Sequence, residues 1–228
     1  MKKKLIIQIV VVAVLLGLVT FLAVYYTTNT DGYKFKKEYE DYNGKKYNND
    51  EREYLSVKIN RNNIVKYSEY ADIKKLLTEG TGVIYFGFPT CPWCRNIVPV
   101  LLDAASETKL ENIYYFNALS MRDIKQLNDA GEIETVKNGT DEYYELINIL
   151  GRYLGDYRGL NDLTIKRLYF PTIVFVKDGA VVDIHIGTIS EHTNGYEELT
   201  EEQKTSLKNT LVNKIRKVQV LTCGASGC

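Results

Sequence analysis

Two cysteines stand three positions apart just after a short apolar run, and this pattern constrains the fold more than any other in the chain. Residues 83–86 are apolar or aromatic, as in a buried strand, and helix-like sequence follows Cys91 and Cys94. We therefore expect Cys91 at a helix N-terminus, where the macrodipole and free N–H groups favour a thiolate. The chemistry indicated is thiol–disulfide exchange, in which Cys91 attacks and Cys94 resolves the mixed disulfide. A single pair of this kind is also half of a zinc site, so the rest of the chain has to decide.

The N-terminus joins positive charge to a long apolar run. Three lysines follow Met1, and residues 5–26 are almost wholly apolar. About 20 apolar residues span a bilayer, and a secretory signal peptide normally has a shorter apolar core. We predict an uncleaved signal anchor and transmembrane helix over residues 1–28, with the lysines cytoplasmic; a cleaved signal peptide is the alternative. Both interpretations predict a remaining chain that lies outside the cytoplasm.

The charge balance argues against one class of partner. Lys plus Arg number 29 and Asp plus Glu number 29, so the formal net charge is zero. Nucleic-acid binding needs a concentrated basic surface. We therefore expect no nucleic-acid partner.

Composition divides the exported part of the chain into three segments. Residues 29–53 are polar and tyrosine-rich with several turn signals, which predicts a solvent-exposed tether. Residues 54–218 predict one folded domain, and residues 219–228 form a tail that carries Cys223 and Cys228. Disulfides persist outside the cytoplasm, and the four cysteines fall into two close pairs rather than a cysteine-rich framework.

Periodicity and turn residues predict alternating strands and helices in the domain. Strands are expected at residues 55–59, 64–67, 83–88, 113–116, 173–176 and 181–186. Helices are expected at residues 68–79, 94–107 and 201–218, the last opened by a capping box of Thr200 and Gln203. Residues 117–168 are expected to be mostly helical, with helices over residues 123–129 and 141–154 and a short piece at 163–167.

The order of these elements resembles the thioredoxin fold over roughly residues 55–218. Pro99 lies five residues after Cys94, where thioredoxins kink the active-site helix. The segment Phe170-Pro171-Thr172 precedes a strand, the turn Lys177-Asp178-Gly179, a second strand and Gly187, and so is similar to the family's cis-proline segment and closing hairpin. The resemblance implies an α/β protein with a central mixed sheet flanked by helices, with residues 117–168 as a helical insertion.

The same resemblance implies roles for particular residues. Pro171 would be cis and face the Cys91–Cys94 pair, leaving the backbone of Phe170 free to bind an extended substrate. The insertion would form a substrate groove or cap the sheet. One departure concerns proton transfer: thioredoxins carry a buried acid six residues before the first cysteine, and Tyr85 occupies that position here.

The residues between and after the cysteines should tune the pair. Pro92 has no N–H to donate, whereas the N–H groups of Trp93 and Cys94 are free to stabilise a Cys91 thiolate. Arg95 adds a positive charge nearby. A lower thiol pKa makes the disulfide more oxidising, which favours an oxidase or isomerase over a reductase. Trp93 is also a candidate contact for the substrate.

The C-terminal pair has three interpretations. Cys223 and Cys228 flank small residues and could close a loose tail, act as a mobile second redox pair, or join the first pair in a zinc site. The spacing fits zinc poorly, and we predict no metal site.

These observations predict a membrane-anchored, extracytoplasmic thiol–disulfide oxidoreductase that needs no dissociable cofactor. Its expected partners are exported cysteine-containing proteins or peptides and a membrane redox partner. The layout also resembles anchored thioredoxin-like proteins found with bacteriocin maturation systems. The rival hypothesis is a non-catalytic binding module whose Cys91–Cys94 disulfide is structural.

Overall fold

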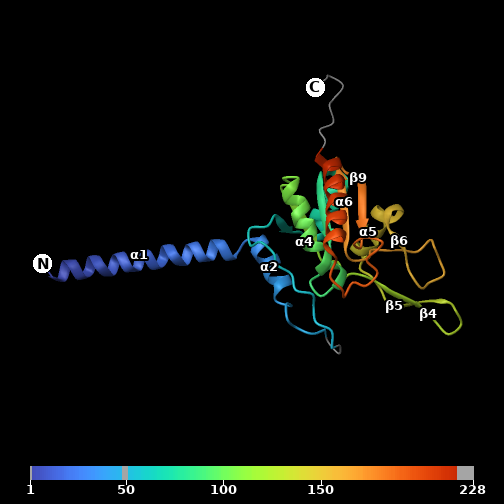
Figure 1. The fold of residues 1–228 in the computed structure, drawn as a ribbon, viewed down its shortest axis with the longest axis horizontal. Coiled ribbons are helices and arrows are strands. Elements are labelled where there is room, and N and C mark those ends of the chain that lie inside the picture. The colour runs from blue at the N-terminus through green and yellow to red at the C-terminus, as the bar shows by residue number, and fades with distance from the viewer. Residues whose placement is uncertain (1, 48–50, 220–228) are drawn as a thin grey trace, which may run out of the picture.

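The computed structural model describes residues 2–47 and 51–219. A five-stranded mixed β-sheet lies at the centre of the folded body (Figure 1). The strand order is β1-β3-β2-β8-β9, with β1 and β2 parallel to β3 and with β8 antiparallel to both β2 and β9. The bounds are β1 Val65–Tyr67, β2 Gly82–Phe86, β3 Ile113–Phe116, β8 Thr172–Lys177 and β9 Ala180–Ile186. The predicted α/β class with a central mixed sheet flanked by helices is confirmed at this level.

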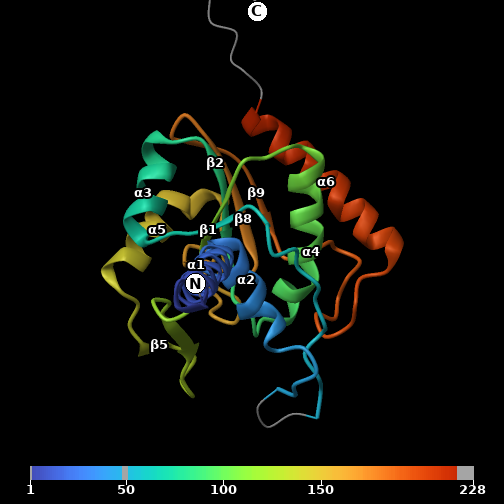
Figure 2. The same ribbon diagram turned by 90° about the vertical axis from the view of Figure 1, so that its left-hand side faces the viewer.

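Helices cover both faces of the sheet, which explains why its central strands are continuously apolar (Figure 2). One face packs against α4 (Pro92–Glu107) and α6 (Glu201–Gln219), and the other against α3 (Tyr70–Glu79) and α5 (Asp141–Leu150). Successive side chains of a strand point to opposite faces. Tyr85 therefore lies on the face covered by α4, and Ile84 lies on the opposite face.

Local signals fix the ends of several elements as predicted. The Thr200 hydroxyl accepts from the N–H of Gln203 at 3.2 Å, and the Gln203 side chain accepts from the N–H of Thr200 at 3.0 Å, which completes the capping box of α6. Between β8 and β9, Asp178 and Gly179 have φ values of 49° and 73°, as a two-residue hairpin turn requires.

The segment predicted to be an exposed tether instead holds a docked helix, α2 (Asp31–Glu40). The hydroxyl of Thr30 caps this helix by accepting from the N–H of Tyr33 at 3.2 Å. Phe35 and Tyr39, one helical turn apart, are 1% and 0% exposed and pack into the core beside α4. The tether prediction is wrong here because burial of two aromatic side chains in the core holds an otherwise polar helix against the domain.

Residues 55–59, predicted as a strand, form no ladder within the described part of the chain. Their backbone is held by side chains from the preceding segment. The N–H of Val57 donates to Asn43 Oδ1 at 3.0 Å, and the N–H of Ile59 donates to Glu40 Oε1 at 2.7 Å. These hydrogen bonds join residues 55–59 to α2 and to the residues that follow it. The folded domain therefore begins near Asp31 rather than at residue 54.

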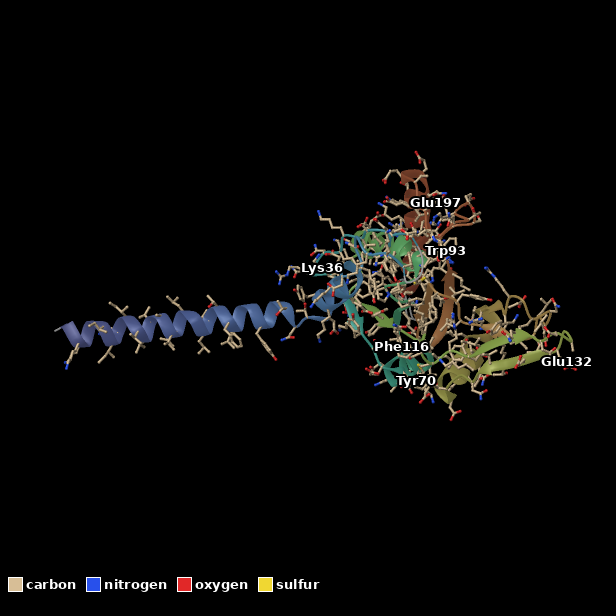
Figure 3. All side chains as sticks on the ribbon, turned by 90° about the horizontal axis from the view of Figure 1, so that it is seen from below. Lys36, Tyr70, Trp93, Phe116, Glu132 and Glu197 are labelled. Atoms are coloured by element: carbon tan, nitrogen blue, oxygen red, sulfur yellow. The ribbon has the colours of Figure 1, made fainter. Side chains whose placement is uncertain are left out.

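The insertion at residues 117–168 is less helical than predicted. Residues 123–129, expected as a helix, contribute instead to a hairpin of β4 (Ile124–Leu127) and β5 (Ile133–Lys137), whose tip carries Glu132 (Figure 3). The reason is the turn, in which Asn128 Oδ1 accepts from the N–H groups of Ala130 and Glu132. The piece near residue 163 is also not helical: after the short 3₁₀ helix η1 (Gly151–Tyr153), β6 (Gly155–Asp156) pairs with β7 (Lys166–Arg167). Of the helices predicted within residues 117–168, only α5 is present.

A long helix, α1 (Lys2–Thr28), projects away from the sheet at the N-terminus (Figure 1). Measured by length and hydropathy, none of the helices in the described residues qualifies as a membrane span. The anchor over residues 1–28 therefore stays a prediction.

Docking of α2 can be tested by removing one buried ring. We expect Phe35→Ala to lower the free energy of unfolding by about 3–5 kcal/mol, because it leaves a cavity in the core. Lys37→Ala, on the exposed side of the same helix, should change it by less than about 0.5 kcal/mol. Denaturant unfolding of both variants measures the difference, and equal values would contradict a docked α2.

Candidate active site

Cys91 and Cys94 lie where β2 leads into α4, as the sequence predicted. Cys91 is the N-cap residue of α4, and its Sγ accepts from the N–H of Cys94 at 3.2 Å. Pro92 occupies the first turn, where a backbone N–H has no intrahelical acceptor, so the missing N–H of proline costs no hydrogen bond. Both cysteines are free thiols, with 4% of Cys91 and 0% of Cys94 exposed.

The pKa values of the two thiols are shifted in opposite directions. Burial by itself raises the pKa of Cys91, but hydrogen bonds from the Cys94 thiol and from the N–H groups of Cys94 and Trp93, with the positive charge of Arg122, lower it below its ordinary value. The pKa of Cys94 is raised, first by burial and then by its hydrogen bond to Cys91 and the charge there. The site therefore favours a thiolate on Cys91 and a protonated thiol on Cys94.

The peptide bond between Phe170 and Pro171 is cis and lies against the first cysteine. The carbonyl oxygen of Phe170 is 3.6 Å from Cys91 Sγ and accepts a hydrogen bond from the thiol form. Pairing of Phe86 with Thr172 between β2 and β8 brings the two segments together. The predicted cis geometry and its position facing the cysteines are confirmed, while substrate binding by Phe170 and Pro171 stays a prediction.

Trp93 is half-buried against the loop that precedes α6 (Figure 3). Its ring meets His192 edge-on, with the ring centroids 5.1 Å apart. Asn96, one turn further along α4, holds the same loop by donating to the carbonyl oxygens of Gly195 and Glu197 at 2.9 and 3.0 Å. A contact between Trp93 and substrate stays a prediction.

Arg95 makes contacts that the sequence did not indicate. Its guanidinium is turned to the protein interior, and the residue is 1% exposed. It donates to neutral oxygens of four residues, namely the carbonyls of Tyr39 and Pro89 at 2.9 Å, of Leu55 at 2.5 Å, and Asn43 Oδ1 at 2.6 Å. These contacts link α4 to the N-terminal segment, and tuning of Cys91 by Arg95 stays a prediction.

Sequence reasoning missed Arg122, a cation that acts on Cys91. Its guanidinium lies 5.2 Å from the centroid of the Phe170 ring, and its charge lowers the pKa of Cys91. Arg122 precedes the β4–β5 hairpin, in the insertion whose structure was mispredicted, so nothing in the sequence pattern linked it to the cysteines.

Two buried tyrosines adjoin the second cysteine. The hydroxyl oxygens of Tyr39 and Tyr85 are 2.8 Å apart, and hydrogen bonding from the Tyr85 side chain lowers the pKa of Cys94 against the larger effect of burial. Both tyrosines are 0% exposed. Tyr39 was missed because it lies in the supposed tether, although its spacing from Phe35 after a capping threonine was a usable helix signal.

The C-terminal cysteines lie outside the described residues. The three interpretations of Cys223 and Cys228, including a zinc site shared with Cys91 and Cys94, therefore stay as the sequence left them.

Two comparisons with known proteins bear on the site. A scan against models of protein families finds no match, and a search of curated protein sequences also finds none. The function therefore has to be argued from the site itself.

The acidity of Cys91 gives a test of the electrostatics. We expect Arg122→Gln to move the midpoint of Cys91 alkylation to higher pH, because the thiolate loses a nearby positive charge. The measurement is the rate of iodoacetamide labelling against pH, with labelled positions assigned by mass spectrometry. Arg158→Gln, an exposed arginine of the same insertion, is the matched control. Equal midpoints for both variants and the unaltered protein would contradict the role of Arg122.

Proposed function

We propose that the protein is a thiol–disulfide oxidoreductase with a thioredoxin-like fold, acting through Cys91 and Cys94. The observation that carries the proposal is the asymmetric thiol pair beside the Phe170–Pro171 backbone. A low pKa on one sulfur, a high pKa on the other and an adjacent cis-proline segment support exchange with an extended polypeptide.

The sheet supports the thioredoxin-like part of the proposal. The strand order is β1-β3-β2-β8-β9, and β8 alone runs antiparallel to the other four strands of this sheet, which is the arrangement expected of that fold. The cysteines follow the central strand β2, and Pro171 immediately precedes its neighbour β8.

The reaction proceeds through one covalent intermediate. The Cys91 thiolate attacks a substrate disulfide, forming a mixed disulfide and releasing one substrate thiolate. Cys94 then loses its proton and attacks Cys91 Sγ, which forms the Cys91–Cys94 disulfide and releases the second substrate thiol. Two electrons pass from the protein to the substrate, and the reverse sequence oxidises a dithiol.

The acidity of Cys91 favours the oxidising direction. A pKa below the ordinary thiol value stabilises the reduced protein, so its disulfide is a better oxidant. We therefore propose that the protein forms or isomerises disulfides in preference to reducing them.

The proposed location is the outer side of the cell membrane, with the N-terminus cytoplasmic. The support is the sequence of the N-terminus together with α1, whose apolar side chains are exposed along most of its length. The proposed substrates are exported cysteine-containing proteins or peptides, with a membrane redox partner that restores the starting state.

One observation favours the rival hypothesis of a non-catalytic binding module. Cys91 is only 4% exposed, and an inert structural disulfide would be similarly buried. The two hypotheses differ in whether Cys91 exchanges with external disulfides.

A trapping experiment separates them. In a Cys223→Ser/Cys228→Ser background, reduced Cys94→Ala should form a stable adduct with a synthetic peptide whose single cysteine is disulfide-bonded to thionitrobenzoate, because the small thiol departs and no resolving thiol remains. Intact-mass spectrometry should detect protein plus one peptide, reversed by dithiothreitol, and Cys91→Ser should give no adduct. Absence of the Cys94→Ala adduct from folded protein would favour the binding module.

The reduction potential tests the direction. Equilibration with glutathione buffers should give a value nearer that of periplasmic oxidases, roughly −120 mV, than that of thioredoxin, roughly −270 mV. The measurement is made with and without Cys223→Ser/Cys228→Ser, so that any contribution of the tail is separated. A value close to thioredoxin's would contradict the oxidising assignment and indicate a reductase.

A further inference from the structure

Three buried side chains from three elements, the resolving cysteine among them, lie in one cluster of the core. Tyr39 comes from α2, Tyr85 from β2 and Cys94 from α4. The tyrosine hydroxyl oxygens are 2.8 Å apart, and hydrogen bonding from the Tyr85 side chain lowers the pKa of Cys94. All three residues are 0% exposed.

Packing on all sides fixes the Tyr85 hydroxyl. Its ring is stacked on Tyr115 at a centroid distance of 5.7 Å and meets Phe35 edge-on at 6.4 Å. At the other end, the hydroxyl occupies the space beside Gly87, where a Cβ would collide with it. Glycine at position 87 therefore leaves the space that the Tyr85 hydroxyl needs beside the active-site loop.

The donor directions follow from the number of protons. Each hydroxyl has one proton to donate, and burial raises the pKa of both tyrosines, so both stay protonated at neutral pH. When Tyr85 donates to the Cys94 sulfur, Tyr39 has to donate to the Tyr85 oxygen. The hydrogen bond from Tyr85 lowers the pKa of Cys94, against the effect of burial.

The second step of the proposed reaction needs such a donor. In the mixed disulfide, Cys91 is covalently bound to substrate and no longer carries the thiolate to which Cys94 donates. Cys94 must then become a thiolate at a fully buried position, where an uncompensated charge is costly. A hydrogen bond to a charged sulfur is stronger than one between neutral groups, so a fixed hydroxyl stabilises the reacting form selectively.

We propose that Tyr85 is a catalytic residue that stabilises the Cys94 thiolate by hydrogen bonding, and that Tyr39 is a positioning residue that orients its hydroxyl. The inference rests on the proposed function, because it concerns the resolving step of that reaction. The step is balanced within the reacting groups: the Cys94 sulfur bonds to Cys91, the bond from Cys91 to substrate breaks, and the Cys94 proton ends on the released substrate thiol.

The test uses a reagent that reports the two steps separately. Full-length protein with Cys223→Ser/Cys228→Ser is reduced and mixed with 5,5′-dithiobis(2-nitrobenzoate). Attack by Cys91 releases one coloured thionitrobenzoate, and attack by Cys94 on the resulting mixed disulfide releases a second. Stopped-flow absorbance gives a rate for each step.

We expect Tyr85→Phe to slow the second release about tenfold at neutral pH, and to slow the first release much less. The pH midpoint of the second release should also rise, because Cys94 loses the bond that lowers its pKa. Tyr39→Phe should produce the same changes with smaller size. A purely structural effect would not move the second midpoint alone.

Tyr115→Phe is the matched control. This tyrosine is 1% exposed on the same face of the sheet, but its hydroxyl donates to Glu38 at 3.1 Å. Its second release should match that of the unaltered protein.

The outcomes distinguish the two proposals. Unchanged second-step rates and midpoints in folded Tyr85→Phe, judged by near-ultraviolet circular dichroism, would overturn this inference while a normal first step upheld the proposed function. If Tyr85→Phe does not fold, Tyr39→Phe carries the test, and an unaltered second step there would overturn it. If folded, unaltered protein releases no thionitrobenzoate, the proposed function fails, and this inference fails with it.

Discussion

The buried guanidinium of Arg95 holds together the parts of the chain on which the site depends. It follows Cys94 directly, yet its hydrogen bonds reach the end of α2, residue 55 and the loop before Cys91. Burying a charge is costly unless its polar hydrogens find acceptors, and here neutral oxygens from separate segments accept four hydrogen bonds from the guanidinium. Without these acceptors the buried guanidinium would be strongly destabilising. The folded state is therefore favoured in one arrangement, in which α2 is docked and the loop before Cys91 packs beside it.

The asymmetry of the two thiols follows from the start of α4. Cys91 stands at the N-cap, where the free N–H groups of the first turn point at its sulfur. Cys94, one turn later, faces the interior, where tyrosine rings replace water. A spacing of three residues thus places two identical side chains in opposite environments, and the difference in their pKa values is a property of the helix start more than of any single neighbour.

The sequence patterns predicted the buried parts of the fold and failed at its margins. Strands β2, β3 and β8 were predictable because helices cover both of their faces and make them continuously apolar, and the cysteine pair with Pro171 located the site. The β4–β5 hairpin was not, because its short strands are largely exposed and its form depends on the turn at Asn128. Tyr39 and Arg122 were missed because their contacts are made by segments far from the cysteines in sequence, which composition and periodicity do not report.

The docking of α2 also decides how far the thiol pair can travel. A flexible tether of about 25 residues would let the domain range over roughly 25–30 Å from its attachment point. Instead α1 ends at Thr28 and α2 begins at Asp31, so only two residues separate the N-terminal helix from the folded body. With α1 in the membrane, as proposed, Cys91 would work at a nearly constant height above the lipid surface, and its substrates would be those that emerge or dock within that narrow layer.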